Sequence, residues 1–189
     1  MKFFFPYFGP LVAHTVVTKD QLKDLKNICN KKISHAKSLA GHFETEYRID
    51  HEKYGKIISP QLQEYKGLYK HFYNNELTSI EPDIAWVNYM KAGDYNPPHL
   101  HTKCRFSSVL FLQIPKKLKQ EHENFKGTSE GPGALAFIYG ENIGEDNIDH
   151  YAKFPEEGDM FIFPSFLKHY VHPFKTKNVE RISIAANYI

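Results

Sequence analysis

The sequence has little cysteine and no long apolar run. Its two cysteines, Cys29 and Cys104, are too few for a disulfide framework, so we expect a reducing compartment, the cytoplasm. No stretch approaches the roughly 20 apolar residues that a membrane-spanning helix needs, and we expect no membrane partner. Residues 1–15 carry one Lys before an apolar run, as a signal peptide does, but Pro6 and Pro10 interrupt the run and no small-x-small cleavage site follows. We therefore expect a strand and a loop there.

An excess of charge of one sign is also lacking. The chain has 24 Lys and Arg against 22 Asp and Glu, a net charge of +2, and no basic block, so a nucleic-acid partner is unsupported. Aromatic residues are abundant instead: 15 Phe and 12 Tyr stand against one Trp. Together with 41% hydrophobic residues, this composition is typical of a packed β-rich core. A length of 189 residues fits one domain.

The N-terminal part of the chain predicts two helices. The first begins at a Thr18 cap, carries apolar residues at helical spacing and ends near Gly41. The second begins at Ser59 as cap, followed by Pro60, and carries a stripe of leucines and aromatic residues. We interpret residues 1–82 as helical and strand support for the rest of the domain.

After Pro82 the pattern changes to short extended runs separated by Gly, Pro and Asp. Seven or eight strands without a helix between them exclude a parallel α/β sheet and leave an antiparallel sandwich or barrel for residues 83–189. The polar, Gly-containing segment 116–133 predicts a long surface loop. The runs are IAWVNYM, SSVLFLQIP, GALAFIYG, NIDHYAKF, GDMFIFP, HYVHPF and RISIAANYI.

Two of the eleven histidines, His99 and His101, stand one residue apart in the stretch NPPHLHTK. At positions i and i+2 of an extended segment, both side chains leave the same face and can reach one metal ion. Pro97 and Pro98 stiffen the approach to the pair. Seven other histidines have no partner at ligand spacing, so we interpret them as solvated or hydrogen-bonded side chains.

A third ligand is expected from the region that follows the Gly-Asp turn at residues 158–159. His169 opens the next strand, whereas His172 lies three residues on, hence on the opposite face, and is the poorer candidate. In the last predicted strand Arg181 and Ser183 share a face. Taken alone, Arg181 indicates a salt bridge or an edge-strand charge, but a guanidinium that faces the interior of a barrel needs an anion.

In this order the segments resemble the Fe(II) and 2-oxoglutarate-dependent dioxygenases, and specifically the small oxygenases of that superfamily that are common in marine bacteriophages. The resemblance covers roughly residues 84–187, with weaker similarity in residues 38–49. The segments that carry it are WVNYMKAGDYNPPHLHTKCRFSSVLFLQIP, GALAF, GDMFIFPSFLKHYVHPF and RISIAAN.

The resemblance implies a double-stranded β-helix, or jelly roll, with N-terminal helices against one sheet, and a cytoplasmic location, in the host if the chain is phage-encoded. It places Fe(II) on His99, His101 and His169, and it places the far carboxylate of 2-oxoglutarate on Arg181 and Ser183. A Tyr on the first core strand contacts the cosubstrate in prolyl-hydroxylase-like members; Tyr89 lies nearest that place, and Asn88 is its rival. The superfamily usually has Asp or Glu at the position of His101. Either three imidazoles hold the ion here, which favours other divalent metals as well, or His101 does not ligate and leaves one more position open.

The leading hypothesis is a dioxygenase that uses Fe(II), 2-oxoglutarate and molecular oxygen, with ascorbate as reductant. Its substrate would be a peptide, protein or small molecule, with peptidyl proline preferred by analogy only. Two alternatives stay open. One is a cupin-like three-His metalloenzyme that does not use 2-oxoglutarate, and the other is a non-catalytic jelly-roll binding module.

Overall fold

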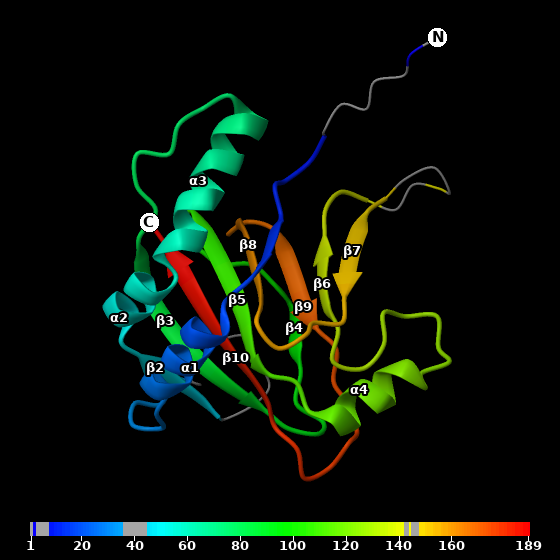
Figure 1. Cartoon of the computed structure of the whole chain (residues 1–189). Coiled ribbons are helices and arrows are strands. Elements are labelled where there is room, and N and C mark those ends of the chain that lie inside the picture. Colours follow the sequence, from blue (N-terminus) through cyan, green and yellow to red (C-terminus); the bar gives the residue numbers. More distant parts are fainter. Residues whose placement is uncertain (1, 3–7, 36–44, 142–143, 145–147) are drawn as a thin grey trace.

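The computed structural model describes residues 2, 8–35, 45–141, 144 and 148–189, and two antiparallel sheets dominate it (Figure 1). The predicted jelly roll is confirmed, and each predicted run contains or overlaps a strand. The larger sheet has the order β1 (Ala13–Val16), β8 (Asp159–Pro164), β5 (Phe106–Gln113), β10 (Arg181–Tyr188), β3 (Pro82–Met90) and β2 (Glu46–Ile49). The smaller sheet has the order β4 (Asn96–His99), β9 (Lys168–Val171), β6 (Leu135–Ile138) and β7 (His150–Lys153).

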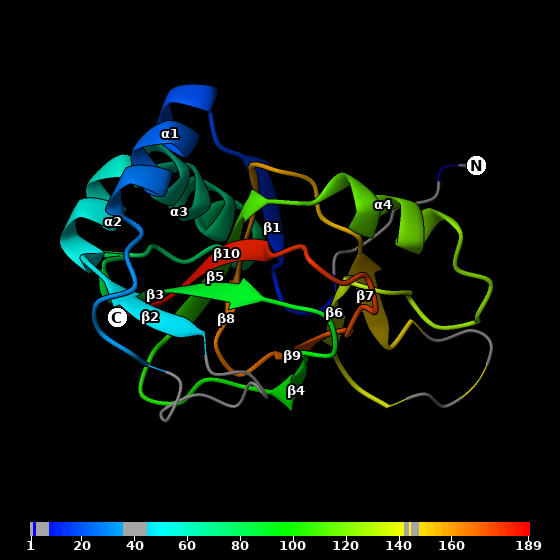
Figure 2. The same cartoon turned by 90° about the horizontal axis from the view of Figure 1, so that it is seen from below.

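Three helices cover the outer face of the larger sheet, and the smaller sheet lies on the other side of it (Figure 2). They are α1 (Lys19–Ile28), α2 (His51–Ile57) and α3 (Ser59–Tyr73). No helix of the described part of the chain has the length and apolar character that a membrane crossing would need.

The first helix begins where the sequence predicts and ends earlier. Thr18 Oγ1 accepts a hydrogen bond from the backbone N–H of Gln21 at 3.2 Å, and the Gln21 side chain accepts one from the backbone of Thr18 at 2.9 Å. The predicted end near Gly41 is wrong, because α1 stops at Ile28 and Cys29 is already extended. Gly41 itself lies outside the described residues.

Two further helical boundaries differ from the sequence-based prediction. Ser59 is the first residue of α3 and not its cap, because α2 runs almost directly into α3 with only Ile58 between them. The segment 116–133, predicted as a loop, begins with a helix, α4 (Lys116–Glu123). Leu118 anchors this helix in the core and is fully buried. A helix therefore does separate two of the strands, although every strand pair is antiparallel.

The larger sheet separates two apolar clusters, because successive side chains of a strand point to opposite faces. In β10, Ile184 and Ala186 belong to the cluster under the helices. In β8, Phe161 and Phe163 belong to the second cluster, between the two sheets. The space between the sheets is therefore lined by alternate residues of the same strands that build the main core. This arrangement brings residues of β3, β4, β9 and β10 around one cavity.

Candidate metal centre

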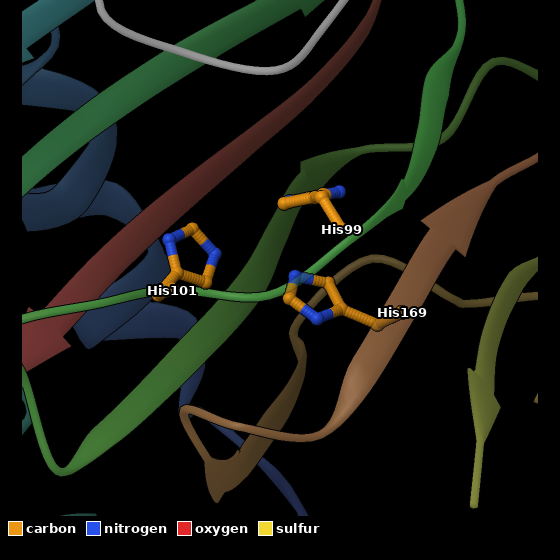
Figure 3. A group of neighbouring side chains, drawn as sticks. All are labelled: His99, His101 and His169. Atoms are coloured by element: carbon orange, nitrogen blue, oxygen red, sulfur yellow. The ribbon is translucent and has the colours of Figure 1, made fainter.

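Three histidines, two in or just after β4 and one in β9, converge on one place (Figure 3). His99 in β4 and His169 in β9 are cross-strand partners, and their ring centroids lie 4.3 Å apart. His101 follows two residues after His99, and its backbone N–H donates to the carbonyl of Ser165 at 2.9 Å. Its ring lies 5.2 Å from that of His99 and 5.1 Å from that of His169. One nitrogen from each ring lies within 4.8 Å of the other two.

Backbone carbonyls orient two of these rings. His99 Nδ1 lies 2.7 Å from the carbonyl oxygen of Pro97, and His169 Nδ1 lies 2.9 Å from that of Leu167. A carbonyl accepts only from a protonated nitrogen, so Nδ1–H donates in both rings and Nε2 keeps its lone pair. This is the usual arrangement of metal-binding histidines. His101 has no comparable ring hydrogen bond among the described residues and stacks on His169 at an interplanar angle of 24°.

The electrostatics of the cluster favour neutral imidazoles. Burial lowers the pKa of His99, and it lowers the pKa of His101 to about 4 with a further contribution from His99. Burial and the neighbouring His99 and His101 lower the pKa of His169 to about 3. All three side chains are therefore unprotonated at neutral pH, which is the form that binds metal. Three imidazole nitrogens suit Fe, Zn, Cu or Ni, so the donor set fits iron without selecting it.

An inner cavity of about 40 Å³ lies between the sheets, next to the histidines, and Arg181 and Ser183 line it. Arg181 is only 3% exposed; one guanidinium NH₂ group donates to the carbonyl of Gly133 at 3.0 Å, while its Nε–H has no partner in the described part of the chain. Burial lowers the pKa of Arg181 to about 10, so the guanidinium stays cationic at neutral pH. Among the described residues Arg181 forms no ion pair. The site thus holds a buried cation that lacks an anion.

Asn88, and not Tyr89, faces this cavity. Tyr89 packs in the cluster under the helices, with its ring 6.0 Å from that of Tyr47, and Lys31 lies over its face at 4.3 Å. Asn88 lines the inner cavity, and its buried side-chain oxygen has no hydrogen-bond partner among the described residues. The order of preference from the sequence is therefore reversed, because neighbouring positions of a strand face opposite sides.

An outer cavity of about 350 Å³ opens on the other side of the histidines. It shares Trp86, Asn96 and the pair His99 and His101 with the inner cavity, so the two adjoin at the metal centre. The sequence did not point to Trp86 or Asn96, nor to Glu46 and His35, which also line this cavity. Asn96 opens the NPPHLHTK stretch, and Glu46 lies in the weakly similar segment 38–49.

The remaining histidines in the described ranges do not extend the cluster. His172, on the opposite face of its strand, lies with Nε2 2.6 Å from a carboxylate oxygen of Glu130. His14 Nε2 lies 2.8 Å from Asp159, and His122 Nδ1 lies 3.1 Å from the carbonyl of Pro132. No second group of three metal-ligand side chains occurs among the described residues. His42 lies outside them.

The fold and the histidine cluster define a jelly-roll protein with a metal-binding site beside a buried arginine. Residues 84–187 match the family described as "Putative 2OG-Fe(II) oxygenase". The match covers more than half of the chain, and the chain belongs to this family of iron- and 2-oxoglutarate-dependent oxygenases. It is therefore an oxidoreductase by family. A comparison with curated proteins gives no match.

Solved structures share the fold at low sequence identity. A Burkholderia pseudomallei oxidoreductase of the 2OG-Fe(II) oxygenase family has a TM-score of 0.61 at 10% identity, covering 94% of this chain and 83% of its own. A Pseudomonas putida prolyl-4-hydroxylase has a TM-score of 0.56 at 15% identity, with coverages of 94% and 91%. The viral collagen prolyl hydroxylase of Paramecium Bursaria Chlorella virus-1, in a 2OG complex, has a TM-score of 0.57 at 13% identity, covering 94% of each chain.

Proposed function

We propose that this protein is an Fe(II)- and 2-oxoglutarate-dependent dioxygenase in which His99, His101 and His169 hold the iron. The observation that carries the proposal is a cationic Arg181 that has no acidic partner among the described residues and is buried in a cavity that adjoins three neutral imidazoles. A guanidinium in such a place destabilises the fold unless an anion binds it. A dicarboxylic acid has one carboxylate that can bind the arginine, and its other carboxylate can bind the metal.

The residues of the inner cavity would bind and orient the cosubstrate. Arg181 and Ser183 would donate charge-assisted hydrogen bonds to the far carboxylate. The cavity of about 40 Å³ offers room for a carboxylate group, so the rest of the five-carbon diacid would extend toward the histidines. Asn88 also lines this cavity and is the third polar group for the cosubstrate, to which its side-chain amide N–H would donate.

Apolar walls would keep water away from the reacting atoms. Phe163, Val171 and Leu135 line the inner cavity, and all three are buried. Low local polarity strengthens the arginine–carboxylate interaction and limits side reactions. When bound, iron and 2-oxoglutarate together supply the oxidising power that inserts one atom of molecular oxygen into a C–H bond, with succinate and carbon dioxide as by-products.

Peptidyl proline remains the preferred substrate by analogy with the prolyl hydroxylases that share the fold. The outer cavity of about 350 Å³ has the size of a typical small-ligand pocket and would accept a side chain or a small molecule. A peptide, a protein or a small molecule is therefore compatible with the site.

The test is the release of labelled carbon dioxide from 2-oxoglutarate by the purified protein with Fe(II) and ascorbate. We expect slow release without a primary substrate, and loss of at least about 100-fold in Arg181→Met, because the buried cation anchors the diacid. Arg105→Met is the matched control, since Arg105 is exposed and donates to the Tyr69 hydroxyl at 2.9 Å. If wild type binds no 2-oxoglutarate, or if Arg181→Met behaves like Arg105→Met, the proposal is wrong.

A second candidate, a cupin-like three-His metalloenzyme, is favoured by one observation: all three ligand side chains are imidazoles. Such an enzyme would bind metal through the same residues and would ignore 2-oxoglutarate. Metal binding without any effect of 2-oxoglutarate on thermal stability would favour this candidate over the dioxygenase.

A further inference from the structure

Glu46 is a buried acid in the outer cavity, and the proposed reaction does not use it. It begins β2 at the edge of the larger sheet and pairs in register with Asn88 of β3. Its side chain is 0% exposed and lines the outer cavity together with His99 and His101. Neither carboxylate oxygen has a hydrogen-bond partner among the described residues. Burial raises the pKa of Glu46 to about 8.

The side chain of Glu46 forms no hydrogen bond or ion pair with a described residue that would stabilise the fold or the metal site. The cation on the same strand, Arg48, directs its Nε–H to His35 Nδ1 at 3.3 Å, and Glu46 forms no ion pair with a described residue. Its oxygens are also not part of the group of ligand atoms that the three histidines form. A buried carboxylate in this position lowers stability, as unpartnered buried polar groups do. It is therefore available to a molecule that enters the cavity.

The charge of the cavity wall indicates which molecule that is. Among the described residues that line the outer cavity, Glu46 is the only acidic one, and none of them is Lys or Arg. Among the described residues of this wall, Glu46 is thus the one Asp, Glu, Lys or Arg side chain. Its electrostatic complement is a cation with hydrogen-bond donors.

We propose that Glu46 binds a positively charged nitrogen group, an ammonium or a guanidinium, of the primary substrate. A carboxylate with both oxygens free accepts several donors of such a group at once. The inference rests on the proposed function only in that the primary substrate is taken to enter the cavity beside the histidines. It narrows the substrate class to a lysine-like, arginine-like or other amine-containing compound or peptide.

The experiment compares isosteric cations and neutral compounds on the full-length protein. Butylguanidinium is paired with butylurea, and butylammonium with butanol. Binding is measured by ligand-observed NMR. The protein is metal-free, because an amine could otherwise bind the metal itself. We expect wild type to bind each cation at least about tenfold more tightly than its neutral partner. Glu46→Gln should abolish the preference, and Glu64→Gln, an exposed control on α3, should keep it.

The outcomes separate this inference from the proposed function. Equal binding of cations and neutral compounds, or binding of none of them, overturns the role of Glu46. Turnover of 2-oxoglutarate is measured in parallel, and it alone tests the proposed function. A Glu46→Gln variant that keeps the preference overturns it too. Glu46→Met provides a second readout: a substrate-binding acid predicts a higher melting temperature together with lost cation preference, whereas a structural acid predicts a lower one.

Discussion

The two faces of the larger sheet treat their buried polar groups differently. On the face under the helices, Tyr188 OH lies 2.7 Å from Ser108 Oγ, and Tyr54 OH lies 3.2 Å from the same hydroxyl and 3.4 Å from Tyr188 OH. Each of these hydroxyls has a partner. On the side of the histidines, Arg181 Nε and Asn88 Oδ1 are buried and have no hydrogen-bond partner in the part of the chain that the structure describes.

This difference indicates that the polar groups under the helices stabilise the fold, whereas those beside the histidines bind ligands. A buried polar group without a partner costs about 1–3 kcal/mol, so the side of the histidines lowers stability while the helix side raises it. The outer cavity continues the pattern, because Glu46 and the side-chain oxygen of Asn96 also lack partners in the described residues. Unpartnered groups that gather around one pair of cavities indicate ligands that the protein is built to receive.

The largest effect is expected from a metal ligand. His169→Ala should weaken Fe(II) binding by more than about 100-fold, because even loss of an outer-shell partner costs 10–100-fold. His172→Ala is the matched control on the same chain segment, since His172 contacts Glu130 and not the cluster. Anaerobic titration with a competing chelator measures both. Equal affinities in the two variants would mean that the three rings do not share an ion.

The second effect is a pH-dependent change in stability at Glu46. Its folded-state pKa of about 8 lies above the ordinary value of 4.5, so the folded protein holds a proton that the unfolded chain releases between these values. Wild-type stability should therefore fall as pH rises from about 4.5 to about 8, and Glu46→Gln should not share that loss. We expect the variant to be about 2–3 kcal/mol more stable at pH 8 and nearly equal at pH 4. Urea denaturation across this range measures the difference; a constant difference would show that the pKa of Glu46 is the same in the folded and the unfolded state.

A smaller effect is expected at His101, whose ring lacks the carbonyl partner that orients His99 and His169. His101→Ala should weaken Fe(II) binding by about tenfold, less than either of the other alanine variants, because a less constrained ligand contributes less. The same chelator competition ranks the three variants. A loss as large as that of His169→Ala would make His101 a full ligand in place of the usual carboxylate.

The sequence predicted the parts of this site that local rules govern. The i, i+2 spacing of His99 and His101 and the position of His169 after the Gly-Asp turn are readable from strand periodicity, and the three rings do meet. The sequence did not decide between Asn88 and Tyr89. These neighbours point to opposite faces of β3, and the sequence does not tell which face lines the inner cavity. Only the packing of the helices against one face decides that.

Other features depend on contacts that no short stretch contains. Glu46 reaches the outer cavity because β2 pairs with β3 in a register that sets it opposite Asn88. The helix α4 begins after Pro115 in a polar stretch whose single buried anchor, Leu118, gives no helical periodicity. The end of α1 was misplaced because apolar residues at helical spacing continue beyond Ile28, although the chain there turns toward the bridge between Ser34 and Tyr47.

The smallest effect is expected on the helix side, and it tests the division between the faces. Tyr188→Phe removes one hydroxyl from a network in which Ser108 and Tyr54 still bond to each other, so the free energy of unfolding should fall by only about 1 kcal/mol. Binding of Fe(II) and of 2-oxoglutarate should not change, because the Tyr188 ring packs in the cluster under the helices. Urea denaturation and calorimetric titration of 2-oxoglutarate measure the two quantities on the same sample. Weaker 2-oxoglutarate binding in this variant would show that the polar groups of the two faces act together, and that satisfied hydrogen bonds on one side position the arginine on the other.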